Sequence, residues 1–118
     1  MQLILNSSHI DGLPALKEFT LNKFNGVSKF LKRWENLGEI ILRVEIARTT
    51  NHHQKGEVFY AEANLELPSH VLRAEVKNKD IRVAINEARK KLELLIRKEK
   101  TKNEVDTKSL RLMRGKVA

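Results

Sequence analysis

Residues 67–100, LPSHVLRAEVKNKDIRVAINEARKKLELLIRKEK, contain the clearest signals of secondary structure in the sequence. The stretch begins at the end of one expected strand, crosses a short turn into a second strand and then enters a long helix. Within the helix, apolar residues recur at intervals of three and four, the spacing of a face buried against a core. Lysines and arginines occupy the rest of its surface, which predicts one face for the core and one for a negatively charged partner. The apolar positions are Ile81, Ala84, Ile85, Ala88, Leu92, Leu95 and Ile96.

Four strands are expected in the chain. Alternating apolar and polar residues predict strands at residues 39–48, 57–67 and 71–77. Pro68 lies in the short connection between the last two, because proline cannot continue a central strand. A short apolar run predicts the first strand, at residues 2–7.

A second amphipathic helix is predicted at residues 13–34. Lys23 falls inside its apolar stripe by angle, so we expect the lysine side chain to extend along the apolar surface toward water. Gly26 lies within the same helix, where glycine costs about 1 kcal/mol relative to alanine. The stripe consists of Leu16, Phe19, Phe24, Val27, Phe30, Leu31 and Trp34.

The predicted order of elements is β-α-β-β-β-α, in the α+β class. Short links predict that the last three strands are antiparallel, whereas the helix between the first two predicts a parallel pair. Each helix has a single apolar stripe, so both must cover the same face of the sheet. We therefore expect a four-stranded mixed sheet with two helices packed on one face. The apolar stripe is lost after residue 102, which predicts a folded domain at residues 1–102 and a flexible basic tail at residues 103–118.

Composition points to a polyanionic partner. The chain has 118 residues and a formal net charge of +8. Residues 13–34 carry five basic side chains against one acidic, and the expected helix at residues 80–102 carries eight against four, whereas residues 35–79 carry six against seven. The positive charge is thus concentrated on the helices, as in proteins that bind polyanions. Basic helices that merely confer solubility are the simpler alternative.

The sequence lacks cysteine and the signals of membrane insertion or secretion. The chain contains no cysteine, so neither disulfides nor thiolate-bound zinc are expected. No apolar run approaches the length that a membrane-spanning helix needs, and no secretory signal is recognised. We expect a cytoplasmic protein without a membrane partner.

The candidate binding residues are the lysines and arginines of the two helices, which can neutralise phosphates with little sequence readout. This pattern indicates a polyanion without separating RNA from DNA or an acidic protein, and Lys29, Lys32 and Arg33 also suit the dipole at a helix C-terminus. The set for RNA binding is Lys23, Lys29, Lys32, Arg33, Arg82, Arg89, Lys90, Lys91, Arg97, Lys98 and Lys100.

Catalytic and metal-binding constellations are not found in the sequence. The chain has neither a glycine-rich phosphate loop nor a nucleophile elbow. Tyr60 is expected on the open sheet face, where a base could stack, although sheets that read RNA use two or three aromatic residues. We therefore expect no enzyme, cofactor or metal. The histidines His9, His52, His53 and His70 are interpreted as solvated, and Glu57, Glu62 and Glu66 as the wet face of a strand.

The opening stretch resembles the N-terminal domain of the ribosome hibernation promoting factor and ribosome-associated inhibitor family. The similarity covers residues 1–102. Its first distinctive motif in the opening stretch is VLRAE at residues 71–75. Near the N-terminus it includes Lys23–Phe24 and the run ILRVE at residues 41–45. In the long helix, the matching residues are Asp80, Ala84, Ile85, Lys91, Leu92, Glu93, Ile96, Arg97, Lys98 and Lys100.

The resemblance implies a bacterial translation inhibitor of stress and stationary phase. Such domains bind the small ribosomal subunit between head and body, overlap the tRNA and mRNA sites and silence the ribosome. By match, contacts to rRNA are implied for Lys23, Lys91, Arg97, Lys98 and Lys100. Arg89 and Lys90 are added from helix geometry alone.

The chain departs from the family pattern at several positions. Arg82 stands where the family has tyrosine, Asn86 replaces an acid, Leu94 replaces an arginine, and Gly26 replaces a lysine. Long members add a second domain that dimerises ribosomes. We expect a short form, with the N-terminal domain only, that is monomeric away from the ribosome. A general double-stranded RNA-binding module and an adaptor for acidic proteins remain alternatives.

Overall fold

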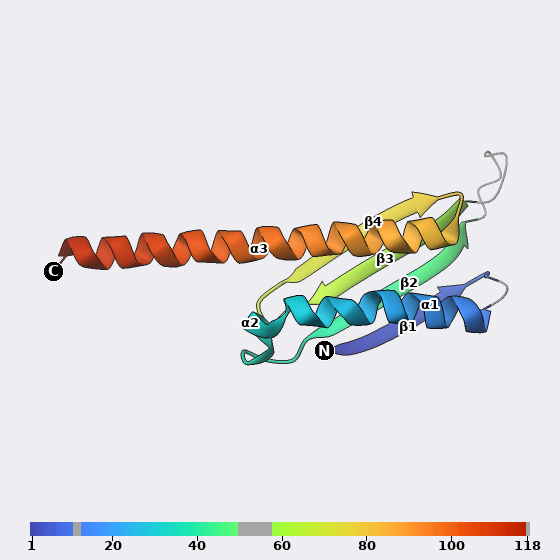
Figure 1. Cartoon of the computed structure of the whole chain (residues 1–118), viewed down its shortest axis with the longest axis horizontal. Coiled ribbons are helices and arrows are strands. Elements are labelled where there is room, and N and C mark those ends of the chain that lie inside the picture. Colours follow the sequence, from blue (N-terminus) through green and yellow to red (C-terminus); the bar gives the residue numbers. More distant parts are fainter. Residues whose placement is uncertain (11–12, 50–57, 118) are drawn as a thin grey trace.

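The structure, a computed structural model, describes residues 1–10, 13–49 and 58–117; for residue 13 and residues 103–117 it describes the backbone. Four strands form one mixed sheet in the order β1-β2-β3-β4, seen behind the helices in Figure 1. β1 is parallel to β2, and the other neighbours are antiparallel. This confirms the predicted fold class and topology. The strands are β1 (Gln2–Ser8), β2 (Ile41–Thr49), β3 (Val58–Glu66) and β4 (Val71–Asn78).

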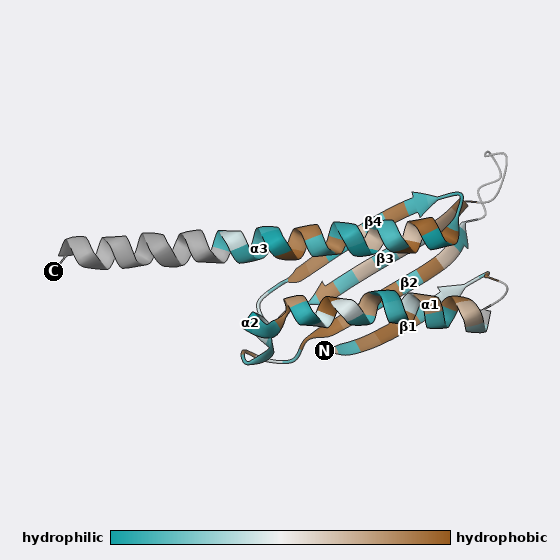
Figure 2. Ribbon diagram, viewed as in Figure 1, coloured by the Kyte–Doolittle hydropathy of each residue, from teal (hydrophilic) through white to brown (hydrophobic). Residues whose placement is uncertain are grey.

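The register of the sheet directs one row of leucines to the core. Leu3 lies opposite Leu42, Leu42 opposite Leu65, and Leu65 opposite Leu72, so each strand contributes one leucine to the same level. Because side chains alternate along a strand, the intervening polar residues lie on the other face. Figure 2 shows this alternation of apolar and hydrophilic residues along the strands.

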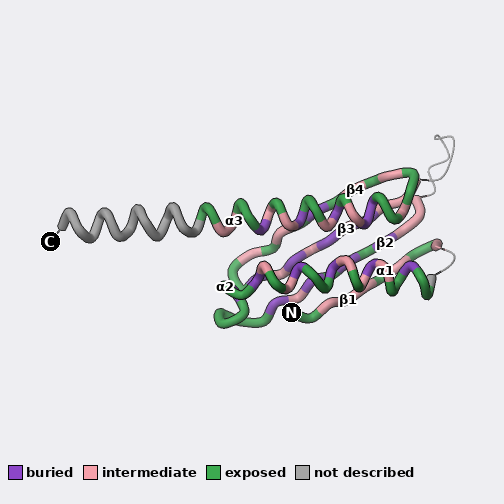
Figure 3. Tube along the Cα trace, viewed as in Figure 1, coloured by how far each residue is buried: buried purple, intermediate pink, exposed green. Residues whose placement is uncertain are grey.

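The helices cover one face of the sheet, as predicted. α1 (Leu13–Asn25) and α3 (Ile81–Val117) lie side by side in front of the strands (Figure 1), and buried positions recur along both helices (Figure 3). α3 packs on β3 and β4. Small side chains permit this close packing, because Ala63, Ala74, Ala84 and Ala88 are fully buried.

The first helical segment is interrupted, which corrects the expectation of one helix over residues 13–34. α1 ends at Asn25, a 3-10 helix, η1 (Gly26–Phe30), follows, and a short helix, α2 (Lys32–Glu35), completes the segment. Gly26 is the first residue of η1 and weakens the α-helix there. A 3-10 helix has three residues per turn and aligns positions three apart. Val27 is fully buried, and Phe30, three residues further along η1, packs against the same core.

α3 begins at a side-chain cap and extends beyond the sheet. The carboxylate of Asp80 accepts hydrogen bonds from the backbone N–H groups of Arg82, at 2.9 Å, and Val83, at 3.4 Å. The helix continues to Val117 rather than ending near residue 102, and its distal part projects past the strands (Figure 1). Residues 81–117 contain no proline, and a helix satisfies its backbone internally, so loss of the apolar stripe does not end it. Whether residues 103–118 form a flexible tail stays a prediction.

Among the described residues, none of the helices combines the length and the apolar character needed to cross a bilayer.

Candidate nucleic-acid interface

The two faces of the molecule differ in charge. The helical layer, residues 13–35 and 81–102, carries thirteen basic side chains against five acidic. The open sheet face, defined by the alternate strand positions that point away from the helices, has four glutamates against three cations. A polyanion is therefore attracted to the helical layer. The charged residues of the open face are Arg43, Glu45, Glu62, Glu66, Arg73, Glu75 and Lys77.

Cations from both helices meet over Phe19, at the seam between α1 and α3. The Lys23 Nζ atom lies 5.4 Å from the ring centroid and the Arg82 Cζ atom 4.7 Å from it. Lys23 is partly buried, as expected for a lysine that follows the apolar stripe. Such cation–π contacts contribute about 0.5–1 kcal/mol each at exposed sites.

A second meeting point forms over Phe30, at the other end of the seam. The Lys29 Nζ atom lies 5.2 Å from this ring centroid and the Lys100 Nζ atom 5.8 Å from it. Arg33 on α2 also donates a hydrogen bond through Nη1 to the backbone carbonyl of Lys100, at 3.1 Å. The structure thus brings together three predicted residues from separate elements. Lys32, in α2, is exposed.

The remaining cations of α3 divide into two rows. Lys90 and Arg97 are exposed and seven residues apart, which is about two helical turns. Lys91 lies on the β4 side, where its Nζ donates to the backbone carbonyl of Glu75 at 3.3 Å. Lys98, seven residues further on, shares that side of the helix. The predicted residues of α3 therefore lie along the seam and in these two rows, and they do not form a single patch.

Arg89 is partly neutralised within the helix. Its Nη1 lies 3.2 Å from the Glu93 carboxylate, and both side chains are partly buried. The sequence spacing also permits Glu93 to pair with Arg97, but in the structure the carboxylate takes the partner one turn before it. Arg89 is consequently the weakest candidate among the arginines of α3.

The open sheet face is held by its own ion pairs. The Tyr60 hydroxyl donates to the Glu62 carboxylate, which also accepts from Asn64 at 2.7 Å and pairs with Arg73 at 2.9 Å. Burial, followed by the bond to Glu62, raises the pKa of Tyr60 to about 12. The hydrogen bonds from Tyr60 and Asn64 hold the pKa of Glu62 below its usual range. Tyr60 is thus engaged with a carboxylate on an acidic face, which disfavours base stacking there.

The other polar sites of the described chain do not converge on a reaction centre. Among the described residues, no three His, Cys, Asp or Glu side chains are placed to hold a metal ion. His9 is exposed, as predicted. His70 is instead partly buried, with its Nδ1 atom 2.7 Å from the Ser69 hydroxyl and its Nε2 atom 2.9 Å from the Glu99 carboxylate, so its interpretation as a solvated histidine was wrong. His52, His53 and Glu57 lie outside the described residues.

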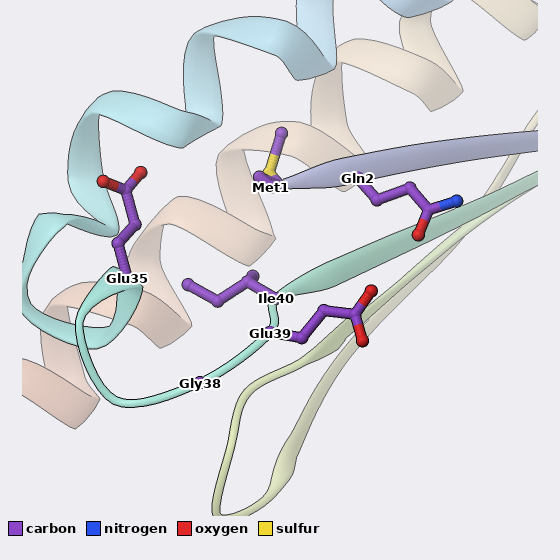
Figure 4. Close-up of a pocket in the computed structure, with 6 residues that line it drawn as sticks. All are labelled: Met1, Gln2, Glu35, Gly38, Glu39 and Ile40. Carbon is purple, nitrogen blue, oxygen red and sulfur yellow. The ribbon is translucent and has the colours of Figure 1, made fainter.

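A pocket at the end of the sheet, between α2 and the start of β2, is also unsuited to a polyanion. Its volume is about 540 Å³. The side chains drawn in Figure 4 include two carboxylates, Glu35 and Glu39, and none of the predicted basic residues. The lining residues are Met1, Gln2, Glu35, Gly38, Glu39 and Ile40.

Sequence reasoning missed the two phenylalanines of the seam as part of the site. Phe19 and Phe30 were predicted as core residues, and both do pack at the edge of the core. The four-residue spacing of Phe19 and Lys23 is a signal that could have revealed one of the cation contacts. The contacts from Arg82 and Lys100 depend on how the helices are placed, and the local sequence does not predict them.

Comparison with protein families identifies the chain. The family described as "Sigma 54 modulation protein / S30EA ribosomal protein" matches residues 3–104. The chain belongs to this family. No relative was found among curated proteins.

Two solved structures have the same fold as this S30EA family member. The N-terminal domain of Thermus thermophilus Protein Y is similar with a TM-score of 0.60 and 18% identity over 83% of this chain and 98% of that one. A ribosomal subunit interface protein from Coxiella burnetii has a TM-score of 0.56 and 24% identity over 86% and 99% of the two chains. At these identities the likeness establishes the fold alone.

Proposed function

We propose that the protein is a ribosome-associated translation inhibitor that binds small-subunit rRNA in the channel for mRNA and tRNA. Membership of a family described as containing a ribosomal protein supports the ribosome as partner. The Coxiella burnetii protein of the same fold is named as a ribosomal subunit interface protein. The proposal assigns RNA contact to the helical layer and none to the open sheet face.

The observation that carries this proposal is the set of unneutralised cations along the seam. Within the part of the chain whose side chains are described, Lys23, Lys29, Arg82 and Lys100 form no salt bridge with a carboxylate. Arginines on the sheet face, by contrast, pair with glutamates, as Arg43 does with Glu66 at 3.1 Å. Cations without internal partners remain available for phosphate, whose binding releases counterions and depends steeply on salt.

The mechanism requires binding and steric exclusion alone. The helices rest on a sheet with a continuous apolar core, so their cations project from a rigid support. Phosphate contacts position a protein on RNA without reading its sequence. A domain held this way in the channel prevents mRNA and tRNA from occupying the same space, and the ribosome stays silent while the domain is bound.

Sedimentation with purified small subunits, large subunits and naked duplex RNA tests the proposal. We expect the protein to co-sediment with small subunits at low salt and to be released as salt rises, with weaker association for the other two partners. Equal binding to duplex RNA would instead favour a general double-stranded RNA-binding module. Association with small subunits that leaves cell-free translation unchanged would refute the inhibitory role.

A further inference from the structure

Two aromatic rings in the seam are each contacted by two cations, one from α3 and one from the N-terminal helical segment. Phe19 is contacted by Lys23 of α1 and Arg82 of α3, and Phe30 by Lys29 of η1 and Lys100 of α3. All four charged groups lie within 5.8 Å of their ring centroid. The two charges at each ring are therefore separated by at most a little more than one Debye length at physiological salt. We call these two arrangements the Phe19 pair and the Phe30 pair.

Like charges at this spacing repel each other, and no carboxylate of the described side chains forms a salt bridge with either pair. The negative face of each aromatic ring provides the attraction that holds the cations in place. A long basic side chain normally loses conformational freedom when it binds a ligand, so holding it beforehand reduces the cost of binding. An anion bound close to both cations would relieve their repulsion as well.

We propose that Phe19 and Phe30 are positioning residues, each of which presents a two-helix cation pair to a phosphate group of the RNA backbone. This inference rests on the proposed function and adds two defined phosphate subsites to it. At the Phe19 pair, the Arg82 guanidinium offers a fork of donors that matches a phosphate, and Lys23 adds a compact charge. At the Phe30 pair, two ammonium groups act as point charges, and the hydrogen bond from Arg33 to the Lys100 carbonyl ties α2 to α3 beside them.

The surroundings of the rings distinguish this role from simple packing. Both rings are only partly buried, so one part of each packs on the core and another remains accessible to the cations. Phe59, on β3, is also partly buried, but among the described residues no cation lies over its ring. Phe59 therefore provides a matched control for the loss of an aromatic side chain.

The test replaces the rings while every charge is retained. The double variant Phe19→Leu/Phe30→Leu removes the aromatic faces but keeps an apolar side chain, and Phe19→Tyr/Phe30→Tyr keeps the aromatic faces. We expect the leucine variant to bind small subunits about tenfold more weakly, which corresponds to about 1.4 kcal/mol. The salt dependence should be unchanged, because the number of cations is the same. The tyrosine variant and Phe59→Leu should bind like the wild type.

Proton NMR of the free protein gives a second, independent readout. The side-chain methylenes of Lys23 and Lys100 should show ring-current shifts in the wild type and the tyrosine variant, and lose them in the leucine variant. Wild-type binding by the leucine variant, an equal loss in the tyrosine variant, or methylenes without ring-current shifts would each overturn the inference. A wild-type protein that does not bind small subunits refutes the proposed function instead, and the NMR result still decides whether the rings hold the cations.

Discussion

Glu62 has three polar partners at the centre of the open sheet face. It accepts hydrogen bonds from Tyr60 and Asn64 and pairs with Arg73, while Glu45 and Glu75 lie directly across from it on the two neighbouring strands. Three carboxylates in one row repel one another, and the donors around the central one offset that repulsion. The face is therefore organised around its own ion pairs and leaves phosphate binding to the helices.

The ionisation of Tyr60 reports directly on this network, since it is the only tyrosine in the chain. We predict that phenolate absorbance titrates with a pKa of about 12. In Glu62→Gln the midpoint should move down toward the ordinary tyrosine value, because the negative charge that opposes ionisation is gone. Circular dichroism at each pH checks that the fold persists. An unchanged midpoint in the variant would show that Glu62 does not control this tyrosine.

The same network should make the free energy of unfolding depend on pH. Because the pKa of Glu62 is lowered in the folded state, its contribution to stability is complete above about pH 4.5 and is lost as the pH falls through the folded value. Tyr60→Phe removes the largest cause of that lowering. We therefore expect the variant to be less stable than the wild type at neutral pH and the difference to shrink below pH 4.5. Urea unfolding at a series of pH values measures this, and a constant difference would contradict it.

At the scale of elements, two glycines have opposite roles. Gly26 begins η1 without a positive φ, and a Cβ there would meet no atom within 4 Å. Gly38 precedes β2 with a φ of +155°, and a Cβ there would lie 3.2 Å from Cγ of Pro68. The first glycine weakens a helix, whereas the second fits a turn that other residues adopt only with strain.

The two alanine variants should consequently shift stability in opposite directions. Gly26→Ala should raise the free energy of unfolding by about 0.4–1 kcal/mol, because alanine restricts the unfolded chain without strain in the folded one. Gly38→Ala should lower it by about 1–3 kcal/mol. Urea unfolding of both variants gives the comparison. Destabilisation by Gly26→Ala would mean that the break after Asn25 needs glycine itself.

The local pattern of apolar and polar residues was sufficient to predict the strands of the sheet and the buried faces of the helices. Alternation along residues 39–48 predicted which side of β2 is buried, because burial of one face directly sets the residue type at every second position. The helix break at Gly26 was not predictable, since tertiary packing decides whether a glycine is absorbed in a helix or ends it. Glu93 had basic residues four positions away on both sides, Arg89 and Arg97, and only the packed structure selects between them.

The grouping of the candidate residues was less predictable than their identity. Helical periodicity separates Lys91 from Arg82, but it does not show that Arg82 meets Lys23 over Phe19. That meeting depends on the placement of α1 beside α3 on the sheet. The sequence could therefore predict a basic helical layer, whereas the paired cations of its seam required the fold.

At the scale of the whole molecule, the core lies within the predicted domain. Among the side chains described, the last buried apolar residue is Ile96. A chain ending at Lys102 keeps every buried residue of the described core, so its free energy of unfolding should lie within about 0.5 kcal/mol of the full-length value. Urea unfolding of both chains tests this division. A larger loss would show that residues 103–118 stabilise the domain and do not form an independent tail.

The location of the basic residues, and not the total charge of the protein, should determine binding to the small subunit. Lys98 on the helical layer and Lys77 on the open sheet face are both exposed, and neither forms a salt bridge among the described residues. Lys98→Glu and Lys77→Glu change the net charge equally. The combined charge reversal of Lys91, Lys98 and Lys100 extends the helical change across α3.

Co-sedimentation with small ribosomal subunits over a salt series compares these variants most directly. We predict that Lys98→Glu weakens binding and reduces the slope of log affinity against log salt by about 0.7–0.9 for the lost phosphate contact. The triple reversal should abolish binding, while Lys77→Glu leaves affinity and slope close to those of the wild type. Equal loss in Lys98→Glu and Lys77→Glu, or undiminished binding by the triple variant, would contradict the assignment of the helical layer as the RNA-binding surface.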